Sequence, residues 1–255
     1  MKATIVLPSG GGCFEGHFPG RPVLPAVAQL DLALQTLASA SRRPSSLRGI
    51  AFARLRQLVL PGDRLELAAR ELDGGRVRID IHRGEALVTN AELILGAPEE
   101  PPEAATAGEP ADPQLSAAPP LDALLPHRGP MRLVTALVRE TNDGLVCTAC
   151  VSRECPLSEQ GRASALAGIE AAAQTAATWE ALRRWREGAG AAPRIGYLVA
   201  LRDVALFAEH IPVDVAMLAT VRLEAAAPPL THYRIEASME GRPLLRGTIA
   251  TYLAG

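Results

Sequence analysis

The chain has 255 residues, of which 48% are hydrophobic and only 4% aromatic, and its formal net charge is −2 at pH 7. This length suits two modest domains with aliphatic, alanine-rich cores. The small net charge gives no electrostatic footprint for nucleic acid or an anionic membrane. No stretch approaches the ~20 apolar residues of a membrane span, and the N-terminus does not read as a signal peptide, so a cytoplasmic location is expected.

The cysteines do not form a metal-binding pattern. Cys147 and Cys150 make a single Cys-x-x-Cys within a strand-like run, where odd spacing sends the two side chains to opposite faces. Without a second pair or a nearby His, buried thiols are the better interpretation than zinc ligands. Nothing in the sequence calls for a metal, a nucleotide or another cofactor.

The first third of the chain predicts one long helix followed by antiparallel strands. A strand is expected over 3–7, and a helix from about 24 to 40 carries Val27, Leu30, Leu34 and Leu37 as one apolar stripe. Alternating segments bounded by Gly, Pro and Asp then predict a run of hairpin-connected strands. These strands are expected at 47–60, 64–71, 76–82 and 86–95.

The remainder predicts a linker and a second unit of the same kind. Residues 97–120 are rich in Pro, Ala and Glu and lack apolar periodicity, so they are interpreted as a linker between a unit at 1–96 and another at 121–255. A second long helix is expected over about 165–187. Strands are expected at 132–140, 145–152, 195–207, 215–225, 231–239 and 243–253.

An internal repeat relates the two predicted helices. A shift of 139 residues places Asp31 on Glu170 and Gln35 on Gln174, in segments that also share Ala and Thr positions. Each acid therefore has a Gln four residues later, on the same helix face. The same shift places His17 on Pro156, so the second unit lacks a counterpart of that His.

His17 lies in the segment Phe-Glu-Gly-His-Phe-Pro-Gly-Arg-Pro-Val-Leu-Pro, immediately before the first helix. Pro19, Gly20, Pro22 and Pro25 constrain this loop and hold the His near the free N–H groups of the helix start. Such N–H groups stabilise negative charge on a carbonyl oxygen, while a neutral His accepts a proton. The arrangement suits enolate chemistry. The alternative is a Pro-rich turn with an incidental His.

This loop and helix resemble the active-site segment of the bacterial 3-hydroxyacyl-acyl-carrier-protein dehydratases, which have the hotdog fold. In that family a His opens a His-Phe-Pro-Gly loop and a carboxylate follows fourteen residues later in the central helix; His17 and Asp31 occupy these positions, although Ala26 replaces a usual glycine. Leu-Pro-His-Arg at 125–128 resembles the opening of the same family. The two halves together resemble the paired dehydratase subunits of bacterial aryl-polyene pathways. The fold implied is α+β, a tandem hotdog in which each sheet wraps a long central helix.

The resemblance implies one complete site, because family members pair the His of one subunit with the carboxylate of the other. That gives His17 with Glu170 as catalytic residues. Asp31 then faces the His-less loop near Pro156 as a remnant, unless the first loop folds back onto it. His127 is expected to be structural in this family, with a minor possibility of lining the degenerate site. Backbone N–H groups near Ala26 are the expected oxyanion donors, and Gln35 and Gln174 the expected hydrogen-bond supports.

The reaction implied is loss of water from a 3-hydroxyacyl thioester on acyl carrier protein, giving the trans-2-enoyl thioester. His17 would take the proton and Glu170 would assist the leaving hydroxyl, although a Glu satisfied by backbone or water is the alternative.

A basic rim for the acidic carrier is expected, and the sequence leaves open whether fused pseudo-dimers pair further. A hotdog thioesterase and a noncatalytic acyl-binding protein are the competing functions. The candidate rim residues are Arg21, Arg42, Arg43, Arg183, Arg184 and Arg186.

Overall fold

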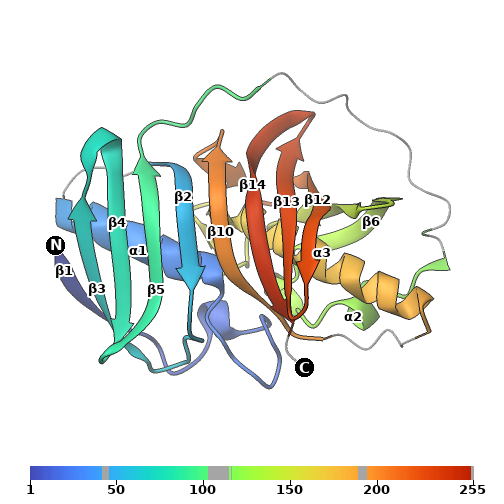
Figure 1. The fold of residues 1–255 in the computed structure, drawn as a ribbon, viewed down its shortest axis with the longest axis horizontal. Coiled ribbons are helices and arrows are strands. Elements are labelled where there is room, and N and C mark those ends of the chain that lie inside the picture. The colour runs from blue at the N-terminus through green and yellow to red at the C-terminus, as the bar shows by residue number, and fades with distance from the viewer. Residues whose placement is uncertain (42–45, 103–114, 116, 189–193, 254–255) are drawn as a thin grey trace.

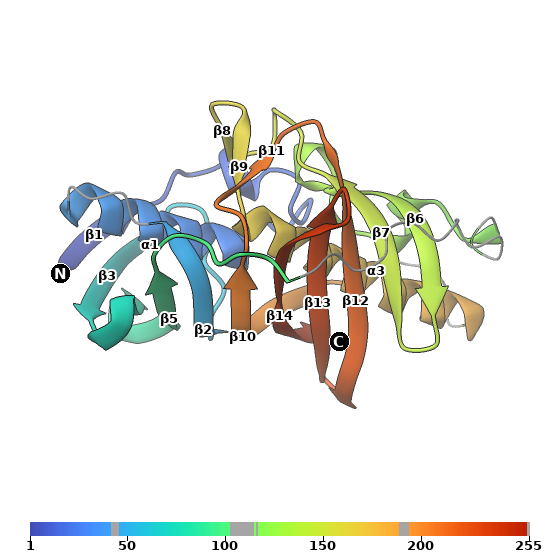
Figure 2. The same cartoon turned by 90° about the horizontal axis from the view of Figure 1, so that it is seen from above.

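Two long helices lie on the same face of one large antiparallel sheet in the computed structural model (Figures 1 and 2). The structure describes residues 1–41, 46–102, 115, 117–188 and 194–253. Over these residues the sheet has 11 strands in the order β1-β3-β4-β5-β2-β10-β14-β13-β12-β7-β6. The first five belong to the first unit and the other six to the second, so the two units share one continuous sheet.

The strands of the first unit match the predicted hairpins closely. Their bounds are β1 (Lys2–Val6), β2 (Leu47–Leu55), β3 (Arg64–Glu71), β4 (Arg76–Arg83) and β5 (Ala86–Leu95). Only β2 is clearly shorter than predicted. After Leu55 the chain leaves the sheet ladder, and the Val59 carbonyl instead accepts the N–H of Leu24 at 2.8 Å. That bond ties the segment after β2 to the loop that carries His17.

The second unit repeats the plan with longer strands. Its large-sheet strands are β6 (Val134–Thr141), β7 (Gly144–Cys150), β10 (Gly196–Leu206), β12 (Ala216–Ala227), β13 (Leu230–Met239) and β14 (Arg242–Leu253). Three short strands form a separate small sheet that the sequence analysis did not predict, since two or three residues show no alternation. These are β8 (Ser158–Glu159), β9 (Arg162–Ser164) and β11 (His210–Pro212).

The two units meet at the antiparallel pair β2 and β10, in the middle of the large sheet (Figure 1). Gly49 of β2 pairs with Ala205, and a Cβ at this glycine would lie 2.6 Å from the Val204 carbonyl oxygen. A residue with a side chain would therefore push the two strands apart. The glycine allows the close approach that continues the hydrogen-bond ladder from one unit to the other.

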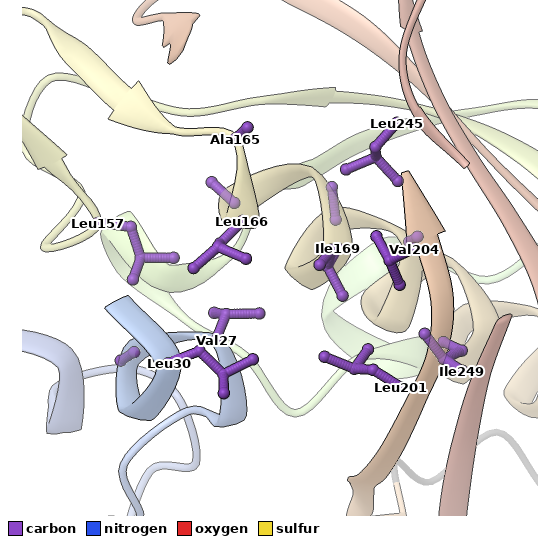
Figure 3. Packing of buried hydrophobic residues seen from close by; sticks show 14 of the residues in the cluster. Val27, Leu30, Leu157, Ala165, Leu166, Ile169, Leu201, Val204, Leu245 and Ile249 are labelled. Carbon is purple, nitrogen blue, oxygen red and sulfur yellow. The ribbon is translucent and has the colours of Figure 1, made fainter. Parts of the chain in front are cut away.

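The helices α1 (Ala26–Ser41) and α3 (Leu166–Arg186) pack their apolar faces against this sheet. Figure 3 shows Val27 and Leu30 of α1 lying beside Leu166 of α3, with Leu201 of β10 close by. All four are buried in one core that runs through both units. The alanine-rich sequence of α3 lets it approach the strands closely, so the units are joined by this core as well as by the shared sheet.

The arrangement confirms the predicted fold class, a tandem hotdog with a central helix in each unit. A short helix, α2 (Leu121–Leu124), lies at the start of the second unit, before β6. Most of the predicted linker, residues 97–120, lies outside the described residues, so the unit boundaries stay predictions. In the part of the chain that the structure describes, no helix is long and apolar enough to cross a membrane.

Candidate active site

His17 is held in a fixed orientation at the entrance to α1. Its Nδ1–H donates to the Val23 carbonyl at 2.9 Å, and its ring stacks on Phe18 with centroids 4.0 Å apart. With Nδ1 carrying the hydrogen of this bond, the neutral ring has its lone pair on Nε2. Only 7% of the residue is exposed. The loop thus presents a shielded imidazole whose Nε2 can accept a proton.

The loop is fastened to the second unit through Gly16. The Arg128 N–H donates to the Gly16 carbonyl at 2.8 Å, and a Cβ at Gly16 would lie 2.2 Å from the Arg128 carbonyl oxygen. Gly16 also has φ +81, in the left-handed region that favours glycine. This glycine therefore permits the contact between the His17 loop and the opening of the second unit.

Glu170 comes from the first turns of α3 and is 3% exposed. Its Oε1 accepts a hydrogen bond from Gln174 Nε2 at 3.0 Å. Gln174 is itself fixed, because it also donates to the Met131 carbonyl and its Oε1 accepts the Leu133 N–H at 2.8 Å. The amide thus bonds the backbone before β6 and holds one oxygen of the carboxyl group.

His127, which was expected to be structural with a minor possibility of lining the degenerate site, lies instead beside Glu170 and His17. Its Nε2 is 3.5 Å from Glu170 Oε1, and its ring centroid is 5.2 Å from that of His17. Burial, the nearby His17 and the Arg128 guanidinium lower the pKa of His127 well below its usual value, so the ring is neutral. Its Nδ1 is buried without a hydrogen-bond partner among the described residues.

His17, His127 and Glu170 therefore form a buried cluster drawn from both units. One ligand-type atom from each lies within 4.8 Å of the others, and among the described residues this is the one His, Cys, Asp or Glu group close enough to share a metal ion. The sequence analysis placed His17 with Glu170 and named His127 as a possible site residue, but it did not place His127 in the same cluster. Its motif was visible, yet only the contact between the units shows which site the motif joins.

The cluster lies at the buried end of a cavity of about 390 Å³. Small residues of α3 (Ala173, Ala176 and Ala177) line one side, and apolar residues from both units line the rest. Ala26 also lines it, so the start of α1, whose first N–H groups have no intrahelical partner, borders the same cavity as the cluster. The opposite end is lined by exposed residues, among them Arg56, Gln57 and Arg194.

Asp31 is not part of this cluster. Its Oδ2 accepts a bond from Gln35 at 2.9 Å, the same contact that Gln174 makes with Glu170. Burial raises the pKa of Asp31, while hydrogen bonds from Ser164 and Gln35 oppose that rise. Ser164 belongs to β9, so Asp31 faces the small sheet of the second unit. The repeat thus gives two similar acid–amide pairs in different surroundings.

The predicted basic rim is only partly assembled. Arg183 lies over the Trp179 ring, with its guanidinium carbon 5.1 Å from the centroid, and Arg186 pairs with Glu140. Arg184 lines the cavity, and Arg21 is exposed. Arg42 and Arg43 lie outside the described residues.

The comparisons with known proteins agree with this division into two units. The model of the ApeP-like family, described as ApeP dehydratase, matches residues 119–254, which is more than half of the chain. The chain belongs to the ApeP-like dehydratase family. The ApeI-like model, described as ApeI dehydratase, matches residues 1–90. The protein is thus a dehydratase that combines an ApeI-like and an ApeP-like unit.

Curated relatives of this ApeP-like dehydratase match over a limited stretch. The 3-hydroxyacyl-[acyl-carrier-protein] dehydratase FabZ of Legionella pneumophila (strain Corby) is 36% identical over 100 residues, which cover 34% of this chain and 67% of the relative. The FabZ of Myxococcus xanthus (strain DK1622) is 44% identical over 63 residues, covering 21% of this chain and 41% of the relative. Both comparisons support the dehydratase family.

Solved structures share the fold over nearly the full length. The dehydratase domain of RzxB from Pseudomonas fluorescens has a TM-score of 0.71 at 15% identity, covering 97% of this chain and 93% of that domain. A monomeric dehydratase domain from a trans AT polyketide synthase split module has a TM-score of 0.70 at 14% identity, and the match covers 99% of this chain and 98% of that domain. At such low identity these structures establish the fold of this ApeP-like dehydratase and nothing finer.

Proposed function

We propose that the chain dehydrates 3-hydroxyacyl thioesters carried by acyl carrier protein to trans-2-enoyl thioesters, in fatty-acid-like or polyene biosynthesis. The observation that carries the proposal is the buried cluster of His17 from the first unit and Glu170 from the second, at the end of one cavity. The substrate class is the one for which the FabZ relatives are named.

His17 acts as the base in this mechanism. Its Nε2 lone pair takes a proton from the carbon next to the thioester carbonyl, since Nδ1–H remains bonded to Val23. The negative charge that develops on the thioester oxygen is stabilised by the N–H groups of the first turn of α1, near Ala26. The electron pair then forms the carbon–carbon double bond as the hydroxyl leaves.

Glu170 acts as the acid toward the leaving hydroxyl. Gln174 donates a hydrogen bond to Oε1, and Nε2 of the neutral His127 lies 3.5 Å from the same oxygen. Because Gln174 already donates to Oε1, Oε2 is the oxygen that carries the carboxyl proton in this role and gives it to the hydroxyl so that water leaves. Return of the proton from His17 to Glu170 restores the site for the next turnover.

The test is turnover of 3-hydroxyoctanoyl-carrier protein, with enoyl formation followed by mass spectrometry as loss of one water. His17→Ala and Glu170→Gln are each expected to lower kcat by at least ~100-fold, a typical contribution of acid–base groups. Asp31→Asn is the matched control, because it changes the repeat-related acid outside the cluster, and it should retain kcat within about threefold.

Two results would contradict this assignment. If Asp31→Asn abolished turnover while Glu170→Gln did not, the active site would lie within the first unit. If the wild type released free 3-hydroxy acid instead of the enoyl thioester, the hydrolase alternative would replace dehydration.

A further inference from the structure

The exposed end of the cavity is basic although the chain as a whole has a net negative charge. Arg56, Arg184 and Arg194 line it, and Glu180 is the one carboxylate that lines it with them among the described residues. Glu180 already accepts the hydroxyl hydrogen of Tyr233. Three guanidinium groups therefore face one engaged carboxylate, which leaves this end attractive to an anion.

None of these three arginines forms a salt bridge with a carboxylate in the described part of the chain, although the Glu180 carboxylate is close enough to act on Arg184. Arg184 donates only to the Glu180 backbone carbonyl, at 3.4 Å, and Arg56 donates through Nε to Asn90 at 3.1 Å. Arg194 has no hydrogen bond or ion pair with any described residue. Burial and the neighbouring Arg194 guanidinium both lower the pKa of Arg184, while the Glu180 carboxylate opposes that shift, so Arg194 and Glu180 both lie near Arg184. Like charges held together without an anion favour binding of one.

The position of these arginines relative to the active site fits one particular anion. From Glu170 to Arg184, α3 rises about 21 Å, and helical side chains lean back toward the N-terminus, so the guanidinium lies roughly 15–20 Å from the carboxyl group. A phosphopantetheine arm has about thirteen bonds between its sulfur and its phosphorus. At the reach of an extended backbone, that is roughly 15 Å.

The direction of the cavity agrees with an arm that enters from this end. His17, His127 and Glu170 are at most 7% exposed, whereas Arg56 and Arg194 are exposed. A thioester held at the cluster therefore has its carrier on the arginine side. Between the two ends, Ala173, Ala176 and Ala177 leave room for an unbranched chain along α3.

We propose that Arg184 and Arg194, assisted by Arg56, bind the phosphate of the 4′-phosphopantetheine arm that presents the thioester to His17 and Glu170. This assignment rests on the proposed dehydratase function and adds a phosphate subsite to it. Arg183, one residue along the same helix, lies outside the cavity lining and packs on Trp179, so it has no part in the subsite.

The test compares two small thioesters of the same 3-hydroxyoctanoyl chain, one on pantetheine and one on 4′-phosphopantetheine. The wild type is expected to show a kcat/KM at least about tenfold higher for the phosphorylated thioester. A gain of this size is typical of hydrogen bonds to a charged group. The double variant Arg184→Gln/Arg194→Gln should bring this ratio close to one. Arg183→Gln should keep the wild-type ratio.

The wild type alone makes the proposal falsifiable, whatever the variants do to folding. Turnover of both thioesters with equal kcat/KM would overturn the phosphate subsite and leave dehydration intact. Turnover of neither the small thioesters nor the carrier-protein thioester would overturn the subsite together with the proposed function. Isothermal titration with phosphopantetheine should show tighter binding than with pantetheine, and equal affinities would also contradict the assignment.

A coenzyme A thioester of the same acyl chain separates the two natural sources of this phosphate. The double variant should lose kcat/KM to a similar degree with the coenzyme A and carrier-protein thioesters, because both contain the same phosphopantetheine phosphate. Loss with the coenzyme A thioester alone would place the arginines on its nucleotide and overturn the assignment.

Discussion

Gln174 donates a hydrogen bond to Glu170 Oε1 at 3.0 Å while it bonds the backbone on either side of residue 132. The side chain thus connects the candidate acid to the start of the second unit's first strand. Gln35 makes the equivalent bond to Asp31 at 2.9 Å, but Gln35 is exposed and Asp31 is only half-buried. Comparing the two pairs therefore shows how much burial adds to the stability that the same acid–amide hydrogen bond provides.

Replacing Gln174 should therefore cost both stability and activity. Gln174→Met leaves the Leu133 N–H and the Met131 carbonyl buried without partners, so the free energy of unfolding should fall by about 3 kcal/mol. Chemical denaturation measures this change. Gln35→Met is the control at the repeat-related position and should change stability by less than about 0.5 kcal/mol. Similar losses in both variants would contradict the role given to the buried amide.

A side chain at Gly16 should separate the His17 loop from the second unit. Gly16→Ala places a Cβ against the Arg128 carbonyl in a left-handed conformation, so a loss of at least about 3 kcal/mol is expected, together with a lower kcat. Gly20 has φ +77, but a Cβ added there would meet no atom within 4 Å. Gly20→Ala should therefore cost only about 1 kcal/mol of conformational strain. If Gly16→Ala and Gly20→Ala changed stability and turnover equally, the contact between Gly16 and Arg128 would not have the importance given to it.

The buried neutral His127 should make the protein less stable in mild acid. In the unfolded chain its pKa returns to about 6.5, so the unfolded state binds a proton that the folded state does not, and the free energy of unfolding falls as the pH falls through that value. Between pH 6.5 and 5.5 the loss should be roughly 1 kcal/mol. His127→Gln should lack this component. Denaturation of the wild type and His127→Gln at each pH measures this component. If the free energy of unfolding changed with pH in the same way in both proteins, His127 would not be neutral in the folded state.

The close approach of β2 and β10 should be required for a site built from both units. Gly49→Val puts side-chain atoms against the Val204 carbonyl, which should weaken the strand pairing between the units and lower both thermal stability and kcat. Gly84→Ala, in the turn between β4 and β5, is the control: its Cβ meets no atom within 4 Å, so it should cost only the ~1 kcal/mol of strain that its φ of +59 imposes and leave kcat unchanged. Retention of full activity by Gly49→Val would show that the helices alone hold His17 and Glu170 together.

Much of the fold and two of the site residues were predictable from the sequence because they depend on local or repeated patterns. The bounds of β3 and β5 follow from alternation between turn residues, and the two helices from apolar stripes and the repeat. The His17 loop is a continuous motif, and the repeat aligns Glu170 with Asp31. Together with the family's pairing of units, these features were enough to place His17 with Glu170.

Contacts between distant segments were decided only by the tertiary structure. His127 had a recognisable motif, yet it joins the cluster because the Arg128 N–H bonds Gly16, a contact between the units that no spacing reveals. Arg56, Arg184 and Arg194 are far apart in the sequence and line the same cavity because the segment after β2, the end of α3 and the segment before β10 border it. Local patterns determine which elements form, whereas packing of the two units against each other determines which side chains meet.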